Sequence, residues 1–99
     1  MEYEFKDKKT YERLLTDGRF TAGFPSHAVS RFRQRIQQIV AAANEKDFYS
    51  LRSLHFEKLK GDRSNQHSMR LNDQWRLVIE LLERNGKKVV HIVGIEDYH

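Results

Sequence analysis

The sequence contains no cysteine and only one proline in its 99 residues. The missing cysteine excludes disulfide bonds, thiolate nucleophiles and cysteine-based zinc sites. No apolar run approaches the roughly 20 residues of a membrane-spanning helix. The charged N-terminal stretch MEYEFKDKK also lacks the hydrophobic region of a signal peptide. We therefore expect a cytoplasmic protein that does not associate with a membrane.

The length and composition predict a single domain spanning residues 1–99. Hydrophobic residues make up 38% and charged residues 32% of the chain, which is polar but well short of the composition of a disordered protein. Six Phe, four Tyr and one Trp provide large side chains for one modest core.

Positive charge is in excess, with 18 Lys and Arg against 14 Asp and Glu. Ten of the cations are Arg and eight are Lys. Because a guanidinium group makes bidentate contacts with phosphate oxygens, this balance favours an anionic partner such as a nucleic acid.

The N-terminal half predicts one strand followed by two helices. EYEFKD alternates in the manner of a short strand, and KKTYERLLTDG has apolar residues at helical spacing. The clearest helix is HAVSRFRQRIQQIVAAAN, with Ser26 as its expected N-cap and Asn44 near its end. Its apolar stripe comprises Val29, Phe32, Ile36, Ile39, Val40 and Ala43.

After Leu54 the apolar period changes to two, which predicts strands in HFEKLK, QHSMRL, QWRLVIELLE and KVVHIVGIED. The short connections between them, containing Gly or Asn, favour an antiparallel meander. The expected fold class is α+β, with a curved antiparallel sheet and helices packed on one face.

Polar residues gather on one face of the predicted sheet. In QHSMRL the residues Ser68 and Arg70 share a face, and in QWRLV the same face carries Gln74 and Arg76. Arg70 and Arg76 flank a tight connection, so antiparallel pairing brings them together. Two arginines repel each other unless an anion joins them, which suggests a phosphate site. The alternative is a solvated face with Asp62 or Asp73 as counter-charges.

The chain ends with Asp97, Tyr98 and His99, and pairing of the last strand can bring them to this basic face. His99 can transfer a proton near neutral pH, Asp97 can orient it, and Tyr98 can bond a phosphate or stack on a base. Cations beside a proton-transfer group suit cleavage of RNA through its 2′-hydroxyl. Such a reaction requires no metal and no cofactor. The alternative is a disordered polar tail.

The segment LKGDRSNQHSMRLNDQWRLVIEL, the terminal IEDYH and the helical TAGFPSHAVSRFRQRIQQI together resemble the HigB toxins of the RelE superfamily. The resemblance implies a RelE-like microbial ribonuclease fold and a ribosome-dependent messenger-RNA endoribonuclease. The implied partners are messenger RNA in the 30S A site and a HigA-type antitoxin that neutralises the toxin. Operator DNA would be contacted only through the antitoxin.

The resemblance also implies catalytic residues where the motifs match. These are Lys60 in LKGD, Arg76 in QWRL and the terminal Asp97, Tyr98 and His99. Some relatives have a histidine three residues before the lysine, where this chain has Glu57; we favour Glu57 over His55, which lies two residues earlier. The expected RNA-binding residues are Lys58, Arg63, Ser68, Arg70 and Gln74.

Glu57 in place of histidine keeps a second function open. The chain would then be a catalytically silent RNA- or ribosome-binding module that acts with its antitoxin in transcriptional autoregulation.

Overall fold

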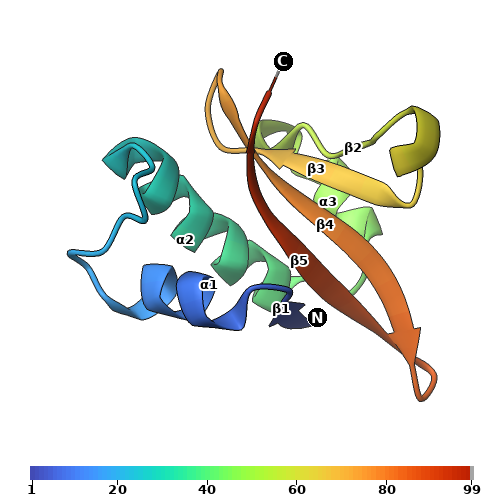
Figure 1. Ribbon diagram of the computed structural model, residues 1–99. Helices are drawn as coiled ribbons and strands as arrows, with labels where there is room; N and C mark the ends of the chain where they lie inside the picture. Colours follow the sequence, from blue (N-terminus) through green and yellow to red (C-terminus); the bar gives the residue numbers. More distant parts are fainter. Residues whose placement is uncertain (99) are drawn as a thin grey trace.

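The computed structural model describes residues 1–98, and the prediction for His99 therefore lies outside the described residues. One sheet is covered on one face by two long helices (Figure 1). The elements are β1 Glu2–Phe5, α1 Lys8–Thr16, α2 Ser26–Ala41, α3 Lys46–Ser50, η1 Arg52–Leu54, β2 Glu57–Lys58, η2 Gly61–Arg63, β3 Gln66–Arg70, β4 Trp75–Arg84 and β5 Lys87–Asp97.

The sheet has five strands in the order β1-β5-β4-β3-β2. Strands β2 to β5 pair antiparallel, which confirms the predicted meander. The β1 strand pairs parallel to β5, so the five-stranded sheet is mixed; the sequence predicted this N-terminal strand but not its partner. The α-amino group of Met1 donates to the carbonyl oxygens of Ile39 and Ala42, at 3.0 and 2.7 Å, which are contacts between segments far apart in the sequence. This attachment at the end of α2 fixes where β1 joins the sheet.

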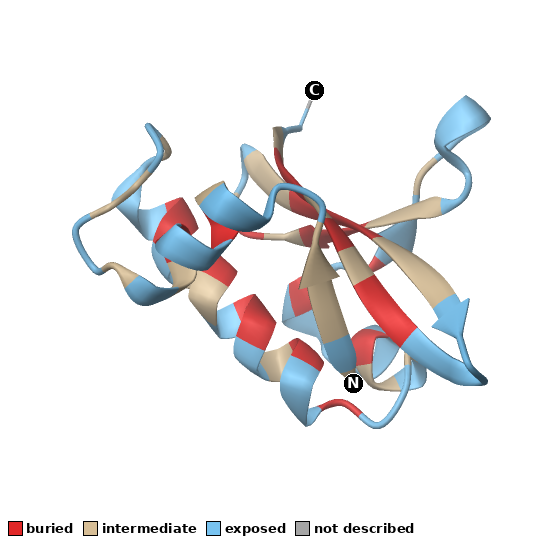
Figure 2. Cartoon of the chain, turned by 60° about the horizontal axis from the view of Figure 1, so that its bottom comes forward, coloured by how far each residue is buried: buried red, intermediate tan, exposed pale blue. Residues whose placement is uncertain are grey.

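The α2 helix lies with its apolar stripe against the sheet, and Phe32 and Ile39 are fully buried. Figure 2 shows the buried positions on the sides where helix and sheet face each other. Three details of the predicted helix are wrong. It starts at Ser26, with Pro25 in the cap position, and it ends at Ala41. Val40 is 56% exposed, and Ala43 is exposed and lies beyond the end of the helix, so neither belongs to the buried stripe.

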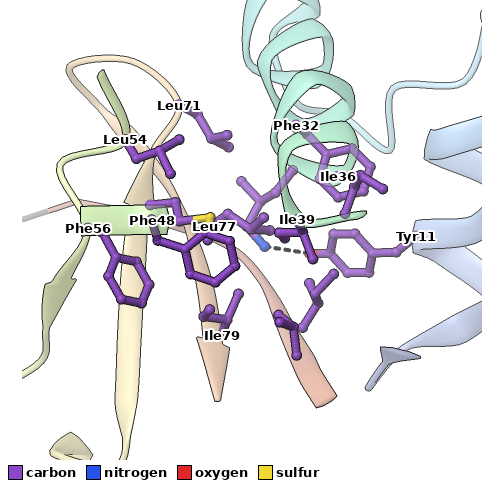
Figure 3. Close-up of a cluster of buried hydrophobic side chains, with 14 of the residues drawn as sticks. Tyr11, Phe32, Ile36, Ile39, Phe48, Leu54, Phe56, Leu71, Leu77 and Ile79 are labelled. Atoms are coloured by element: carbon purple, nitrogen blue, oxygen red, sulfur yellow. Dashed lines mark hydrogen bonds between the residues drawn. The ribbon is translucent and has the colours of Figure 1, made fainter. Parts of the chain in front are cut away.

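A single cluster of apolar side chains joins the helices to the sheet (Figure 3). The β4 strand contributes Leu77 and Ile79, which alternate towards the helices as predicted and are fully buried. Phe48 from α3 and Leu54 from η1 belong to the same cluster, together with Met69 of β3. The opposite face of β4 carries Arg76 and Glu80 together with the buried Val78. None of the helices in residues 1–98 is long and apolar enough to cross a membrane.

A β-bulge interrupts the β4–β5 pairing, because Val78 pairs with Gly94 whereas Ile79 pairs with Ile92. A Cβ atom at position 94 would stand 2.6 Å from the hydroxyl oxygen of Tyr11. That hydroxyl accepts a hydrogen bond of 2.7 Å from the backbone N–H of Ile95, drawn in Figure 3. Bulges bend a strand and re-aim the residues beyond them. In this sheet, the residues beyond the bulge are the last residues of β5.

The strand predicted over HFEKLK is much shorter, since β2 contains only Glu57 and Lys58. His55 instead ends η1 in the left-handed conformation, with φ of 43°. It therefore does not share a strand face with Glu57, which removes the geometric basis for treating the two as alternatives.

Candidate active site

The polar face of the sheet is densest where β4 begins and β5 ends. Register places Arg76 between Arg70 on β3 and Glu96 on β5. Directly opposed residues of paired strands project to the same face. Since Leu77 next to Arg76 is buried under the helices, this set lies on the opposite face.

The guanidinium of Arg76 is the centre of the cluster. Its Nη1 donates to Glu57 Oε1 at 2.5 Å and to Ser68 Oγ at 2.8 Å. Its Cζ atom lies 3.5 Å from the centroid of the Tyr98 ring, a cation–π contact. Only 12% of the side chain is exposed. Three partners from three different segments therefore hold one arginine in place.

Strand pairing explains this arrangement. Glu57 and Ser68 are direct partners between β2 and β3. Ser68 is two residues from Arg70, the partner of Arg76, which makes Ser68 and Arg76 diagonal neighbours within reach of a long side chain. Ser68 is fully buried, and its hydroxyl serves as an anchor for the guanidinium.

The C-terminal segment is tied to the connection between β3 and β4. The backbone N–H of Tyr98 donates to the carbonyl oxygen of Gln74 at 2.6 Å, and Gln74 Nε2 donates to Asp97 Oδ2 at 3.2 Å. Tyr98 is nevertheless 49% exposed. One side of its ring covers Arg76, and enough of the side chain remains accessible to meet a ligand.

A second chain of contacts runs beside the first. Arg63 Nη2 bonds both carboxylate oxygens of Glu96, at 2.8 and 2.9 Å, and its Nε donates to Gln66 Oε1 at 2.9 Å. Gln66 in turn donates to Glu80 Oε2 at 2.9 Å. Glu96, Gln66 and Glu80 are not among the site residues predicted from the sequence. The alternation of β3 would have indicated Gln66, and the register of β5 would have indicated Glu96.

The arginines of this face already have carboxylate partners. Arg70 pairs with Asp73, the counter-charge considered from the sequence, and Arg76 pairs with Glu57. Arg70 therefore has one of the two counter-charges considered from the sequence, whereas the partner of Arg76 is Glu57 and neither Asp62 nor Asp73. Lys58 and Lys60 differ, because both are exposed and neither forms an ion pair with an acidic side chain of residues 1–98.

The other histidines do not join the cluster. His55 lies in a separate surface hollow with Tyr49 and Arg52. His67 stacks on Phe56 with ring centroids 4.8 Å apart, and burial, followed by the charge of Lys58, lowers its pKa. Within residues 1–98, no group of three or more His, Asp or Glu side chains is placed to hold a metal ion.

Solved structures show the fold first. The fold aligns with the YoeB/ParE toxin from Agrobacterium tumefaciens over the whole of both chains, with a TM-score of 0.64 at 16% identity. It also aligns with a chain of the YoeB–YefM complex from Staphylococcus aureus, with a TM-score of 0.59 at 18% identity, covering 100% of this chain and 97% of that one. At such identities the likeness shows a shared fold, that of RelE-type toxins.

Residues 3–99 match the family described as the RelE-like toxin of the type II toxin–antitoxin system HigB, and the chain belongs to that family. A curated relative, Endoribonuclease HigB of Proteus vulgaris, is 31% identical over 91 residues, covering 88% of this chain and 89% of the relative. The resemblance drawn from the sequence is thus confirmed, and both findings support an endoribonuclease toxin. A type II toxin has a protein antitoxin as its partner.

Proposed function

We propose that this protein cleaves messenger RNA on the ribosome, within the 30S A site, and that a HigA-type antitoxin neutralises it. The observation that carries the proposal is the fixed Arg76 guanidinium beneath the exposed Tyr98 ring. A preorganised cation that need not rearrange is the kind of group that stabilises charge developing on a transferring phosphoryl centre.

The reaction we assign is attack of the RNA 2′-oxygen on the adjacent phosphorus. The 2′-hydroxyl loses its proton, the P–O5′ bond breaks, and the 5′-oxygen leaves with a proton, giving a 2′,3′-cyclic phosphate. Arg76 and the exposed Lys60 neutralise the charge of the phosphorane intermediate. The reaction is proposed to be independent of added metal.

The remaining roles follow from position. Glu57 holds Arg76 and retains acceptor sites on its carboxylate, so it can orient the guanidinium or take the 2′-proton. Tyr98 donates its hydroxyl to a phosphate oxygen or stacks on a base, and Asp97 orients the terminus. His99 is proposed as the proton-transfer group. Lys58, Arg63, Ser68, Arg70 and Gln74 are proposed to bind RNA or to position the groups that do.

Purified protein incubated with translating ribosomes tests the proposal. Mapping of 5′ ends should reveal discrete cuts in ribosome-bound messenger. Protection of the message without any cut would contradict the enzymatic proposal.

A second assay tests metal independence. Cleavage of free RNA should survive EDTA, and free RNA is used because chelation also dismantles ribosomes. A strict requirement for an added divalent ion would refute the mechanism.

One observation favours a second candidate, the silent binding module of transcriptional autoregulation. Arg63, Arg70 and Arg76 are each already neutralised by a carboxylate. A site with compensated arginines can bind RNA through Lys58 and Lys60 without attacking it. The same ribosome assay discriminates, because the module would protect the message and leave it intact.

A further inference from the structure

A second cationic hollow lies outside the Arg76 cluster. A cavity of about 320 Å³ opens between the first half of α2, η1 and the end of β3. Its lining includes His27, Arg31 and Arg35 from α2, together with Arg70 and Asp73. No function proposed above uses His27, Arg31 or Arg35.

Arg35 is buried in the wall of this cavity, with 3% of its surface exposed. Its Nε donates to the carbonyl oxygen of Arg70 at 2.9 Å, Nη1 to Gln38 Oε1 at 3.0 Å and Nη2 to the carbonyl oxygen of Ser53 at 3.4 Å. All three acceptors are uncharged. A guanidinium has five N–H donors, so two remain after these bonds.

The cavity has more positive than negative charge. Asp73 is the acidic residue in its lining, and Arg70 already pairs with it. Burial lowers the pKa of Arg35, and the charges of Arg31 and Arg70 lower that pKa further. A buried cation without a counter-ion is costly, and an anion seated among these side chains would offset the cost.

Arg70 connects the cavity to the candidate active site. It lines the cavity, its carbonyl holds Arg35, and its strand partner is Arg76. A single RNA strand carries a phosphate at every nucleotide. The cavity lies on the α2 side of Arg70 and Arg76 lies on the opposite face of the sheet, so a strand with its scissile phosphate at Arg76 would bend around the end of β3 at Arg70 to bring a neighbouring phosphate to the cavity.

We propose that the cavity formed by Arg31, Arg35 and Arg70 binds a second, uncleaved phosphate of the RNA strand. The inference rests on the proposed function, since it extends the RNA path of the same site. Several guanidinium groups around one cavity match the multiple acceptor oxygens of a phosphate. A carboxylate of the antitoxin has the same charge, but the adjoining Arg76 cluster favours RNA.

The test uses the full chain and a hexanucleotide of 2′-O-methyl RNA, which cannot be cleaved through its 2′-oxygens. NMR signals of arginine Nε–H groups and of the Ser53 and Asn72 amides should shift on titration. Arg31→Gln should abolish the shifts at the cavity, because Arg31 is half-buried in its lining. The variant should fold, because Arg31 makes no side-chain hydrogen bond or ion pair within residues 1–98. Lys87→Gln is the matched control, since it removes one charge at the far end of β5.

Binding affinity gives a second readout. The slope of log K against log salt concentration should fall by about 0.7 in Arg31→Gln, the loss of one phosphate contact on a single strand, and should not change in Lys87→Gln. Equal slopes in both variants, or shifts at Tyr98 with none at the cavity, would overturn the second phosphate and leave the proposed function intact. Shifts at the cavity with purified antitoxin and none with the hexanucleotide would also overturn it. Failure to cut ribosome-bound messenger is measured in a separate assay and would contradict the proposed function alone.

Discussion

Two arginines at opposite ends of β4 each pair with a glutamate, yet their surroundings differ. Arg76 pairs with Glu57, and 12% of its side chain is exposed. Arg84 pairs with Glu4 on β1, and 55% of its side chain is exposed. Arg76 also bonds the buried Ser68 and lies under the Tyr98 ring, whereas Glu4 shares its carboxylate with His91 Nδ1 at 2.5 Å.

The difference in surroundings supports different roles for the two ion pairs. At the Arg84 end, the pair joins two strands that do not pair with each other, β1 and β4, across β5. At the Arg76 end, neighbouring groups immobilise the cation and leave an exposed aromatic side chain beside it. We therefore assign stability to the first pair and RNA chemistry to the second.

The largest expected effect is that of replacing Arg76 with glutamine, and the same replacement at Arg84 is the control. Arg76→Gln should lower single-turnover cleavage of ribosome-bound messenger about 10²–10³-fold, the usual cost of losing a preorganised charge-stabilising group. Arg84→Gln should leave cleavage unchanged, because that side chain is remote from the Arg76 cluster. Equal losses in both variants would show that the two ends do not differ in function.

Tyr98→Phe should have the next largest effect. Phenylalanine retains the ring over Arg76 and removes only the hydroxyl, so the loss is that of a hydrogen bond to a charged group, about 1.5–3 kcal/mol of transition-state stabilisation. The measurement is the same cleavage assay, with thermal unfolding as a check on the fold. Wild-type activity in Tyr98→Phe would assign Tyr98 to stacking alone.

The bulge between the two ends of β4 provides a stability test. Gly94→Ala should lower the free energy of unfolding by about 1–3 kcal/mol in urea titration, because the new Cβ meets the Tyr11 hydroxyl oxygen at 2.6 Å. Gly18→Ala is the matched control, since a Cβ there has no neighbour within 4 Å. If Gly94→Ala is as stable as Gly18→Ala, the tight packing of Tyr11 against the bulge is not a constraint.

The smallest expected effect concerns the free energy of unfolding that the Glu4–Arg84 pair contributes, and how it depends on pH. Hydrogen bonds from Arg84 and then His91 lower the pKa of Glu4 below its usual value of 4.5. A carboxylate with a depressed folded-state pKa contributes stability that is complete above the unfolded value and is lost as pH falls through the folded one. The unfolding free energies of wild type and Glu4→Gln should therefore converge below about pH 4.5. A constant difference across this range would remove the assigned role of the pair.

Much of this architecture could be predicted from the sequence because it depends on local pattern. An apolar period of two residues predicted β3, β4 and β5, and apolar residues at helical spacing predicted α1 and α2. Parallel addition of β1 to β5 could not be predicted, since it depends on where the Met1 amino group meets the end of α2. A competing left-handed turn at His55 likewise shortened β2.

For the candidate site, the sequence predicted which residues take part, whereas the contacts between their side chains depend on the strand register seen in the structure. The proximity of Arg70 and Arg76 followed from the short connection between their strands. Asp73, the partner of Arg70, was considered from the sequence, but the pairing of Arg76 with Glu57 was not deduced, because Glu57 reaches this face through the β2–β3 pairing. Arg35 is not part of the apolar stripe predicted for its helix, and its burial arises from contacts with the distant β3 and η1 segments.

The most direct test is to end the chain at Asp97, the last residue of β5, and map 5′ ends on messenger after brief expression. The shortened chain should fold, as judged by an unchanged circular dichroism spectrum, and should produce no cuts because Tyr98 and His99 are gone. Cuts at the same positions and rates as those of the full chain would contradict the claim that the end of β5 and Arg76 form the catalytic centre.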